Sequence, residues 1–297
     1  MGRRKNGQYL FYIAAIIVCI LIYLRYSVST EGFNAIEDTL SEIPEFIPHK
    51  TYNEERVVSG VPLVIYQSWH INKVPPKMKE SIYKLIEMNP EFDYKLFSDA
   101  TSVKYIQDNF DEGVVNAFNA LKPGAFKSDL WRYCILYKEG GVYLDIKLHT
   151  IKPLLPVIRD NPTIYVKDLK GSCIGEDVGL YNAFMVSPPG NVIFKYCIDD
   201  IVNSAKFKLY KDTFLSVTGP CLLGDIVYKN ISLDYIKQLK FRLFWYGNMP
   251  ENDVEIKYNG DSIIKSYIGY RMEQSKYLTV QKTKHYSTLW NDRDIYN

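Results

Sequence analysis

The stretch that decides the fold is KSDLWRYCILYKEGGVYLDIK, which runs from Lys127 to Lys147. Its first half places apolar side chains at helical spacing, and Gly140 ends the helix. The apolar residues after the glycines have the pattern of a short buried strand with Asp145 at its end. A helix that leads directly into a buried strand is typical of α/β folds.

The same alternation extends along the chain on both sides of this stretch. Further strands are expected at 61–66, 93–99, 142–148, 162–168, 181–187 and 241–247. Further helices are expected at 75–89, 101–110, 112–121 and 191–207. Because helices and strands alternate, we predict an α/β fold with a mostly parallel central sheet.

The overall composition excludes one class of partner. Of the 297 residues, 47% are apolar, which is enough for a packed core. The 36 basic and 34 acidic side chains leave a net charge of only +2, and no basic stripe occurs beyond the N-terminus. We therefore expect no nucleic-acid partner.

The N-terminus has the pattern of a membrane anchor. Three basic residues at 3–5 precede an apolar run from Tyr9 to Leu24 that contains no charge, and Arg25 closes the run. The positive-inside rule then keeps the N-terminus in the cytosol and places the rest of the chain in a lumen or outside the cell. The alternative is a cleaved signal peptide, for which Ser27 and Ser29 offer a cleavage site.

These features divide the chain into four predicted segments. They are a cytosolic tail at 1–8, a transmembrane signal anchor at 9–25, a stem at 26–60 and one globular domain at 61–297. The expected protein is a single-pass type II membrane protein. A glycosylation sequon at 230–232 fits a lumenal domain. The cysteines outside the anchor leave three disulfide pairings open among Cys134, Cys173, Cys197 and Cys221.

Charged side chains in the central stretch are candidates for chemistry. Ligands of open α/β sheets bind at the carboxyl ends of strands, where Asp145 is expected. Asp129 and Arg132 lie three residues apart, so their side chains can meet on one face of the helix. If the strand continues past Asp145, then Lys147 and His149 share its face. A turn-forming aspartate and a surface ion pair are the structural alternatives.

The central stretch resembles the signature of glycosyltransferase family 32. The family pattern is Ala-x-x-Ser-Asp, then Arg, then Leu-Tyr, then Gly-Gly-x-Tyr-x-Asp-x-Asp. The matching residues are Ala125, Ser128, Asp129, Arg132, Leu136, Tyr137, Gly140, Gly141, Tyr143 and Asp145.

Other segments extend the resemblance over the range 61–290. The opening segment is similar to that of the family at Ile65, Gln67 and Trp69, although Tyr66 replaces a histidine. The later family blocks match at Asn182, at the Thr-Gly-Pro of 218–220, and at the spaced pair of His285 and Trp290.

The resemblance implies a GT-A fold, a nucleotide-sugar donor and sugar transfer to an acceptor hydroxyl with retention of configuration. The implied donor-binding residues are Gln67, Trp69, Asp129, Arg132, Tyr143, Asp145 and Trp290. Gln67 and Trp69 would line the nucleotide pocket, and Trp290 would close over the donor. The implied catalytic residues are Asp145, Lys147 and Arg132, and the implied metal ligands are Asp145 and His285.

The chain departs from the family pattern at Lys147, where the second aspartate of the Asp-x-Asp motif is expected. Negative charge grows on the departing diphosphate, and Mg²⁺ or Mn²⁺ usually absorbs it. A protonated ammonium cannot bind a metal. Three explanations stay open. Lys147 replaces the metal, the metal binds through Asp145 with His149, His285 or Asp292, or the protein binds sugars without catalysis.

The predicted function follows from this resemblance. It is transfer of a hexose from a UDP- or GDP-sugar to a glycan or glycoprotein acceptor, with Mn²⁺ or Mg²⁺ as the expected cofactor. The predicted location is the Golgi or another secretory membrane, and host secretory membranes if the chain is viral. The alternative function is a non-catalytic, membrane-anchored protein that binds nucleotide sugars or glycans.

Overall fold

The computed structural model describes residues 39–51, 55–174, 178–246, 254–281 and 284–297. The predicted cytosolic tail, the predicted anchor and the first part of the predicted stem lie outside the described residues. Within the described ranges, no helix combines the length and the apolar character needed to cross a bilayer.

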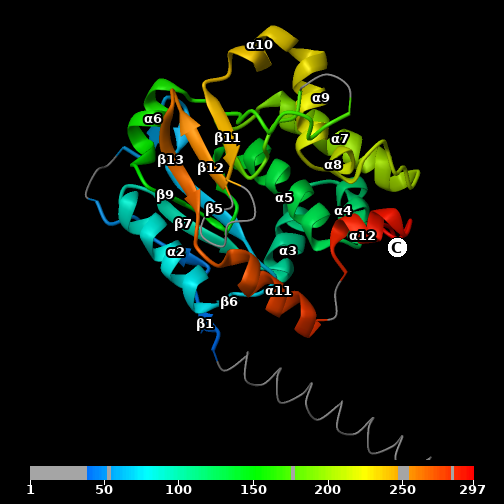
Figure 1. Ribbon diagram of the computed structural model, residues 1–297, viewed down its shortest axis with the longest axis horizontal. Coiled ribbons are helices and arrows are strands. Elements are labelled where there is room, and N and C mark those ends of the chain that lie inside the picture. Colours follow the sequence, from blue (N-terminus) through cyan, green and yellow to red (C-terminus); the bar gives the residue numbers. More distant parts are fainter. Residues whose placement is uncertain (1–38, 52–54, 175–177, 247–253, 282–283) are drawn as a thin grey trace, which may run out of the picture.

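The centre of the fold is a five-stranded sheet (Figure 1). Its strands are β2 (Phe46–Ile47), β5 (Val64–Ser68), β7 (Asp93–Phe97), β8 (Gly141–Leu144) and β10 (Phe184–Ser187). They lie in the order β10–β8–β5–β7–β2. Strand β5 is parallel to β7 and to β8, whereas β2 and β10 run antiparallel to their neighbours.

The prediction of a mostly parallel central sheet is therefore wrong, because both edge strands are antiparallel. The reason at β10 is visible in the pairing of Phe184 with Leu144. The Asp145 N–H donates to the Ala183 carbonyl over 2.8 Å. The chain thus re-enters the sheet at the edge where β8 ends, so β10 must run in the opposite direction.

A second sheet of four strands is antiparallel throughout. Its strands are β9 (Leu148–Thr150), β11 (Phe241–Trp245), β12 (Val254–Tyr258) and β13 (Asp261–Ser266), in the order β11–β12–β13–β9. Two short strand pairs are β1 (Ser41–Glu42) with β6 (Lys73–Val74), and β3 (Val57–Val58) with β4 (Val61–Pro62).

Helices cover both faces of the central sheet. They are α2 (Pro76–Met88), α3 (Asp99–Asn109), α4 (Glu112–Ala120), α5 (Gly124–Glu139), α6 (Leu154–Asp160), α7 (Val192–Lys206), α8 (Phe214–Val217), α9 (Pro220–Asn230), α10 (Leu233–Gln238), α11 (Tyr270–Gln281) and α12 (Tyr286–Asn291). Figure 1 shows α4, α5 and α7 on the right of the central strands and α2 and α6 on the left, with strands of the second sheet overlapping the central sheet in this view.

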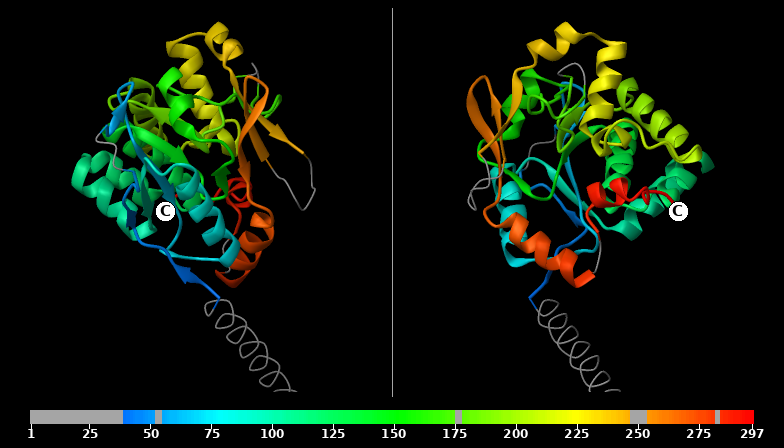
Figure 2. Two further views of the ribbon diagram at one scale, coloured as in Figure 1. Left: turned by 90° about the vertical axis from the view of Figure 1, so that its left-hand side faces the viewer. Right: turned by 45° about the vertical axis from the view of Figure 1, so that its right-hand side comes forward.

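The alternation of side chains along the central strands creates two separate cores. On β5, Ile65 packs into the core beneath α2 and the second sheet, whereas Tyr66 packs into the core beneath the helices α4, α5, α7 and α9. On β8, Val142 and Tyr143 divide in the same way. Figure 2 shows the outcome, with the orange β12–β13 hairpin and the yellow-green helix α7 at opposite edges in the right-hand view.

Two glycines make the turn from α5 into β8. Gly140 has a φ of 68° and Gly141 a φ of 97°. A Cβ on Gly140 would lie 2.6 Å from the Pro189 nitrogen, and a Cβ on Gly141 would lie 3.0 Å from the Tyr66 ring. Only glycine fits both conditions, so this pair fixes the direction in which β8 and its terminal aspartate leave the helix.

Several sequence predictions need correction. The strand expected at 142–148 ends at Leu144, because residues 145–147 turn before β9 begins in the other sheet. The segment expected to be a strand at 162–168 forms only isolated β-bridges. Ile164 pairs with Val186, and Lys167 pairs with Leu180 and with Arg242. Part of the segment predicted as a stem also packs into the domain, since β2 pairs with β7.

The structure resolves the cysteine pairing among the described residues. Cys173 and Cys221 form a disulfide that joins the loop before β10 to the first turn of α9. Cys134 and Cys197 are free thiols buried between helices. Burial raises the pKa of both thiols, which makes them inert core residues.

Candidate active site

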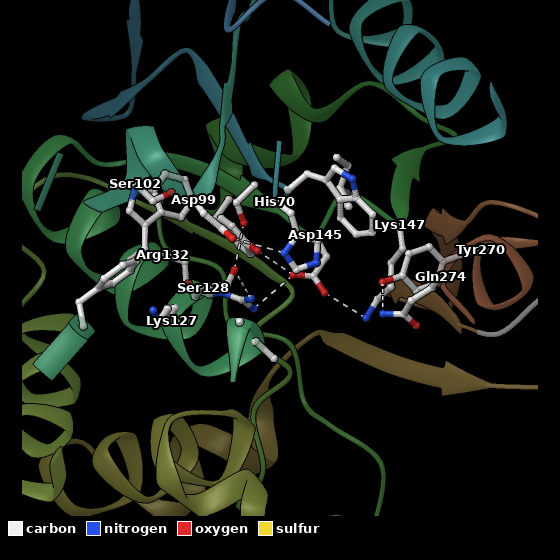
Figure 3. Close-up of a pocket in the computed structure, with 18 residues that line it drawn as sticks. His70, Asp99, Ser102, Lys127, Ser128, Arg132, Asp145, Lys147, Tyr270 and Gln274 are labelled. Atoms are coloured by element: carbon white, nitrogen blue, oxygen red, sulfur yellow. Dashed lines mark hydrogen bonds and ion pairs between the residues drawn. The ribbon is translucent and has the colours of Figure 1, made fainter. Parts of the chain in front are cut away.

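A pocket of about 160 Å³ opens at the carboxyl ends of β5 and β8 (Figure 3). This is the position where open α/β sheets bind ligands. Its lining comes from the end of β5, the first turn of α3, the first half of α5, the turn after β8 and the helix α11. The polar and charged residues that line it are Ser68, His70, Asp99, Ser102, Lys127, Ser128, Arg132, Tyr143, Asp145, Lys147, Tyr270 and Gln274.

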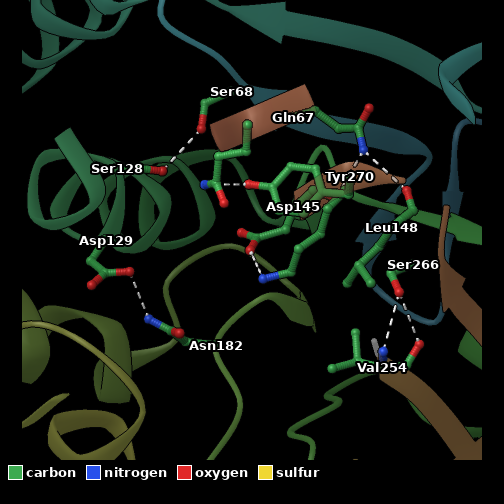
Figure 4. A network of polar contacts seen from close by, with 12 residues as sticks. Gln67, Ser68, Ser128, Asp129, Asp145, Leu148, Asn182, Val254, Ser266 and Tyr270 are labelled. Carbon is green, nitrogen blue, oxygen red and sulfur yellow. Dashed lines mark hydrogen bonds and ion pairs between the residues drawn. The ribbon is translucent and has the colours of Figure 1, made fainter. Parts of the chain in front are cut away.

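The turn after β8 is held rigidly from below. The Leu148 N–H donates to the Asp145 carbonyl over 2.8 Å. The Gln67 side-chain amide donates to the same carbonyl over 3.2 Å and to the Leu148 carbonyl over 3.4 Å (Figure 4). The Tyr94 hydroxyl donates to the Gln67 Oε1 over 2.9 Å. Gln67 is fully buried and does not line the pocket, so its contacts support the Asp145 turn rather than a nucleotide.

The Asp145 carboxylate accepts contacts from three side chains. The Tyr143 hydroxyl donates to Oδ1 over 2.8 Å, and the Arg132 Nη1 lies 3.2 Å from the same oxygen. The Lys147 Nζ lies 3.0 Å from Oδ2. Burial acts to raise the pKa of Asp145, but the charges of Lys147 and Arg132 outweigh burial and lower it. Asp145 is therefore a stable anion at neutral pH.

Lys147 is fixed at both its backbone and its side chain. The Tyr267 N–H donates to the Lys147 carbonyl over 3.0 Å, which ties the turn to the end of β13. The ammonium lies 5.5 Å from the centre of the Tyr181 ring and pairs with Asp145. Burial disfavours its charge, but Tyr181 and Asp145 outweigh this and raise the pKa of Lys147 well above its ordinary value. Its side chain is 24% exposed, so it remains accessible from the pocket.

Asp129 forms the buried half of the same cluster. The Asn182 side-chain amide donates to Oδ1 over 2.9 Å (Figure 4). The Thr218 hydroxyl donates to Oδ2 over 2.6 Å. The Arg132 Nη2 lies 3.3 Å from Oδ1. Burial raises the pKa of Asp129 although Arg132 and the two hydrogen bonds oppose it.

Arg132 joins the two aspartates. Its Nη1 donates to the Asn182 carbonyl over 2.9 Å, and its Nη2 donates to the Ser128 hydroxyl over 3.0 Å. Its guanidinium carbon lies 4.4 Å from the centre of the Tyr143 ring. Burial opposes its charge, but Tyr143 and the two aspartates raise the pKa of Arg132. The guanidinium is a permanent cation in the wall of the pocket.

Trp69 lines the pocket as predicted for a nucleotide-binding ring. It stands one residue beyond β5, is 8% exposed, and lies 5.0 Å from the His70 ring between centroids. The indole belongs to the hydrophobic core, and only a small part of it borders the pocket. The prediction that it binds a nucleotide stays a prediction.

Helix α11 supplies pocket residues that the sequence prediction lacks. Tyr270 and Gln274 lie one turn apart on this helix and face the pocket (Figure 3). The Gln274 side-chain amide donates to the Tyr270 hydroxyl over 2.8 Å. The only sequence signal for this part of the fold is the Asn259–Gly260 pair in the preceding hairpin, because α11 itself has little amphipathic pattern.

Besides Gln67 and the buried Asp129, two predicted site residues on or next to α12 do not line the pocket. His285 caps the N-terminus of α12, with its Nδ1 2.7 Å from the Ser287 hydroxyl. The Trp290 indole N–H donates to the Tyr210 carbonyl over 2.7 Å. Neither residue lines the pocket, so this conformation does not place Trp290 over a donor.

The donor atoms near Asp145 do not fit a divalent metal. Both carboxylate oxygens already contact cations or a hydroxyl, and the neighbouring Lys147 has no lone pair while it is protonated. Among the described residues, no three His, Cys, Asp or Glu side chains come together as a metal-binding group. His149, on β9 of the second sheet, has its Nδ1 3.3 Å from the Ser81 hydroxyl of α2, and Asp292 pairs with Lys284. The explanation that combines Asp145 with His149, His285 or Asp292 is therefore not supported.

Comparisons with known proteins show which family the central segment resembles. Residues 75–164 match the family model described as a glycosyltransferase sugar-binding region containing a DXD motif. This range includes α5, β8 and the Asp145 turn. The resemblance to glycosyltransferases predicted from the sequence is confirmed. The chain differs from the description of the family at one point, because it carries Asp-Ile-Lys at 145–147.

Two relatives of the chain are named as mannosyltransferases. The chain is 26% identical over 241 residues to inositol phosphoceramide mannosyltransferase 2 of Schizosaccharomyces pombe, which covers 79% of this chain and 65% of that protein. It is 25% identical over 143 residues to inositol phosphoceramide mannosyltransferase 3 of the same yeast, covering 47% and 39%. The match to these two relatives thus spans less than two thirds of their length.

One solved structure is also similar. The structure titled PaToxG Glycosyltransferase aligns with a TM-score of 0.43 and 15% identity over 58% of this chain and 69% of that one. This likeness is too distant to support an argument about the fold.

Proposed function

We propose that the chain is a retaining glycosyltransferase that moves a hexose from a nucleotide-sugar donor to an acceptor hydroxyl. The observation that carries this proposal is the cluster of Arg132, Asp145 and Lys147 in the pocket at the end of β8, beside the Trp69 ring. The pocket lies in the segment related to other glycosyltransferases. The two cations suit a diphosphate, and the ring suits a base. A GT-A-like arrangement is the fold that we infer.

The reaction needs few groups from the protein. The bond between the sugar C1 and the diphosphate oxygen breaks, and its electron pair leaves with the nucleoside diphosphate. The acceptor oxygen forms the new bond to C1, and its proton passes to the departing phosphate oxygen. The protein's task is to orient the donor and to stabilise the charge that develops on the diphosphate.

The contacts made by Asp129 and Asp145 support retention of configuration, with attack from the side of the leaving group. The Asp145 oxygens contact Tyr143, Arg132 and Lys147, and the Asp129 oxygens accept from Asn182 and from the Thr218 hydroxyl. A carboxylate tied in this way is a poor nucleophile for a covalent intermediate. We therefore favour a single displacement on one face of the donor.

The relatives suggest which donor and acceptor to test first. Their names specify mannose transfer to inositol phosphoceramide. GDP-mannose is accordingly the first donor candidate, and UDP-sugars follow. A phosphoinositol-containing lipid joins glycans and glycoproteins as an acceptor candidate. The Cys173–Cys221 disulfide supports the proposal of a lumenal domain in the secretory pathway, because disulfides persist in oxidising compartments.

Donor turnover by the full-length protein in detergent tests the proposal. The donors are GDP-mannose, UDP-glucose, UDP-galactose and UDP-N-acetylglucosamine, and the readout is released nucleoside diphosphate. We expect one donor to be consumed and Asp145→Asn to reduce its consumption about 100-fold or more. Asp261→Asn is the matched control, because Asp261 pairs with Lys152 on the exposed surface. Product with inverted configuration would refute retention and attack from the leaving-group face.

The alternative function is a protein that binds nucleotide sugars without catalysis. Lys147 in the motif is the observation that favours it. Binding of one of these donors without any turnover, with each acceptor class present, would support this alternative over the transferase.

A further inference from the structure

We propose that Lys147 takes the place of the divalent cation, so that the protein binds the diphosphate of its donor without a metal. This inference rests on the proposed function, because it concerns the same pocket. It also explains why the donor atoms around Asp145 do not fit a metal.

The first argument is the charge of the site. Exchange of an aspartate for a lysine changes the formal charge of one position from −1 to +1, a difference of two units. This difference equals the charge that a bound Mg²⁺ or Mn²⁺ would bring. A chain with Lys147 therefore reaches, through its own side chains, the charge that an Asp-x-Asp site reaches only with a metal bound.

The second argument is that the ammonium is fixed in place. The Lys147 backbone is tied to Tyr267, and the turn is tied to Gln67 and to the carbonyl of Ala183. Asp145 then holds the Nζ atom at 3.0 Å. A cation that is already oriented loses little conformational entropy when a diphosphate arrives, and it needs no reorganisation during the reaction.

The third argument is that the ammonium keeps an N–H group for a ligand. An ammonium carries three N–H groups, and Asp145 is the one carboxylate that the structure pairs with it. The side chain lines the pocket and is partly exposed. Because Asp145 and Tyr181 both contact the ammonium, the remaining N–H group is available for a phosphate oxygen, and Arg132 supplies a second positive charge in the same pocket wall.

A purely structural role for Lys147 is the main competing explanation. In that case the lysine would only neutralise Asp145, and a diphosphate would not contact it. The two explanations differ in what happens to diphosphate binding when the charge is removed and the fold is retained.

Calorimetric titration of the full-length protein with GDP and with UDP separates them. We expect one of these nucleotides to bind in EDTA, with an affinity that added Mn²⁺ or Mg²⁺ leaves within about twofold. Lys147→Met should weaken this binding about 10- to 100-fold, and Lys147→Arg should retain most of it. Lys152→Met is the matched control, because Lys152 forms an exposed ion pair outside the pocket. Thermal unfolding of each variant shows whether the fold is retained.

The reverse exchange sharpens the test. Lys147→Asp restores the Asp-x-Asp motif, and we expect it to lose binding in EDTA and to regain it with Mn²⁺. Wild-type binding that requires Mn²⁺ or Mg²⁺ would overturn the inference, as would equal affinity in wild type and in a folded Lys147→Met variant. Absence of binding of both nucleotides would also overturn it.

Turnover distinguishes failure of this inference from failure of the proposed function. Consumption of a donor only with Mn²⁺ would leave the transferase standing and overturn the role of Lys147. Metal-free nucleotide binding that Lys147→Met weakens, without turnover of any donor, would leave the role of Lys147 standing and overturn the transferase.

Discussion

The two aspartates of the site lie on either side of one arginine, yet they behave as two different regions of the molecule. Asp129, on α5, is buried among Asn182, the Thr218 hydroxyl and Arg132. Asp145, at the end of β8, faces the pocket and shares its carboxylate with Lys147. Burial raises the pKa of Asp129, whereas the two cations lower that of Asp145.

Within this one cluster, the buried Asp129 stabilises the structure, and the pocket-facing Asp145 is placed to act on a ligand. The inner carboxylate has its oxygens satisfied by uncharged donors and one cation, and it fixes Arg132 in place. The outer carboxylate contacts two cations, of which Lys147 remains accessible from the pocket whereas Arg132 is buried. Substitution on the inner side should therefore act mainly on stability, and substitution on the outer side mainly on function.

Loss of the shared arginine should have the largest effect. Arg132→Met leaves Asp129 and Asp145 without their common partner in a buried setting, which we expect to lower the free energy of unfolding by about 3–5 kcal/mol. Urea unfolding measures this change. Arg159→Met, at an exposed position in the last turn of α6, is the control and should cost less than about 0.5 kcal/mol. A loss below about 1 kcal/mol for Arg132→Met would break the comparison.

Substitution of Asp145 should reduce donor turnover more than stability, and substitution of Asp129 should reduce stability more than turnover. Asp145→Asn removes the anion that positions Lys147, so donor turnover should fall about 100-fold or more with a modest loss of stability. Asp129→Asn points an N–H₂ group at Asn182 or Thr218, which both donate to the native carboxylate. This should lower stability by about 1–3 kcal/mol and reduce turnover less than Asp145→Asn does. Measurements of donor turnover and of unfolding on both variants test this prediction. If the ratio of turnover loss to stability loss were the same for both variants, Asp129 and Asp145 would not have distinct roles.

The dependence of stability on pH should also differ in sign. Asp145 has a lowered pKa in the fold, so its stabilisation is present above the ordinary value of 3.8 and is lost as the pH falls through the folded value. Asp129 has a raised pKa, so its contribution falls as the pH rises from 3.8 through the folded value.

Unfolding of wild type and both asparagine variants over about pH 3 to pH 7 measures these slopes. Relative to wild type, Asp145→Asn should become less stable as the pH rises, and Asp129→Asn should become more stable. Slopes of the same sign would contradict the assignment of the two environments.

The smallest expected effect concerns the hydroxyl that supports the outer aspartate. Tyr143→Phe removes one hydrogen bond to Asp145 Oδ1 but keeps the ring against Arg132. We expect a loss of about 1 kcal/mol in stability and a decrease in turnover of about fivefold. A decrease as large as that of Asp145→Asn would indicate that Tyr143 touches the donor itself.

The local part of the site is predictable from the sequence. The helix around Asp129 and Arg132, the glycine turn and the terminal Asp145 follow one another within the chain, and glycine is the residue type that allows the positive φ of this turn. Local periodicity and turn chemistry therefore place these three side chains together. The prediction that Trp69 lines the pocket comes from the family resemblance, and Trp69 follows β5 by one residue.

The remainder depends on contacts between distant segments. The turn at 145–147 exists because β9 joins a second sheet through β13, where Ile264 pairs with Thr150. Burial of Gln67 beneath that turn follows from the same long-range packing, and it changes the role of this side chain. Tyr270 and Gln274 reach the pocket only after that sheet has formed. Patterns within a short window do not contain these pairings.

The crystal structure of the protein with its bound nucleoside diphosphate, grown in EDTA, tests the central claim most directly. The account predicts a diphosphate in the pocket at the end of β8, with a phosphate oxygen within hydrogen-bond distance of the Lys147 ammonium and with no metal beside it. A diphosphate bound elsewhere, or one that Lys147 does not contact, would contradict it.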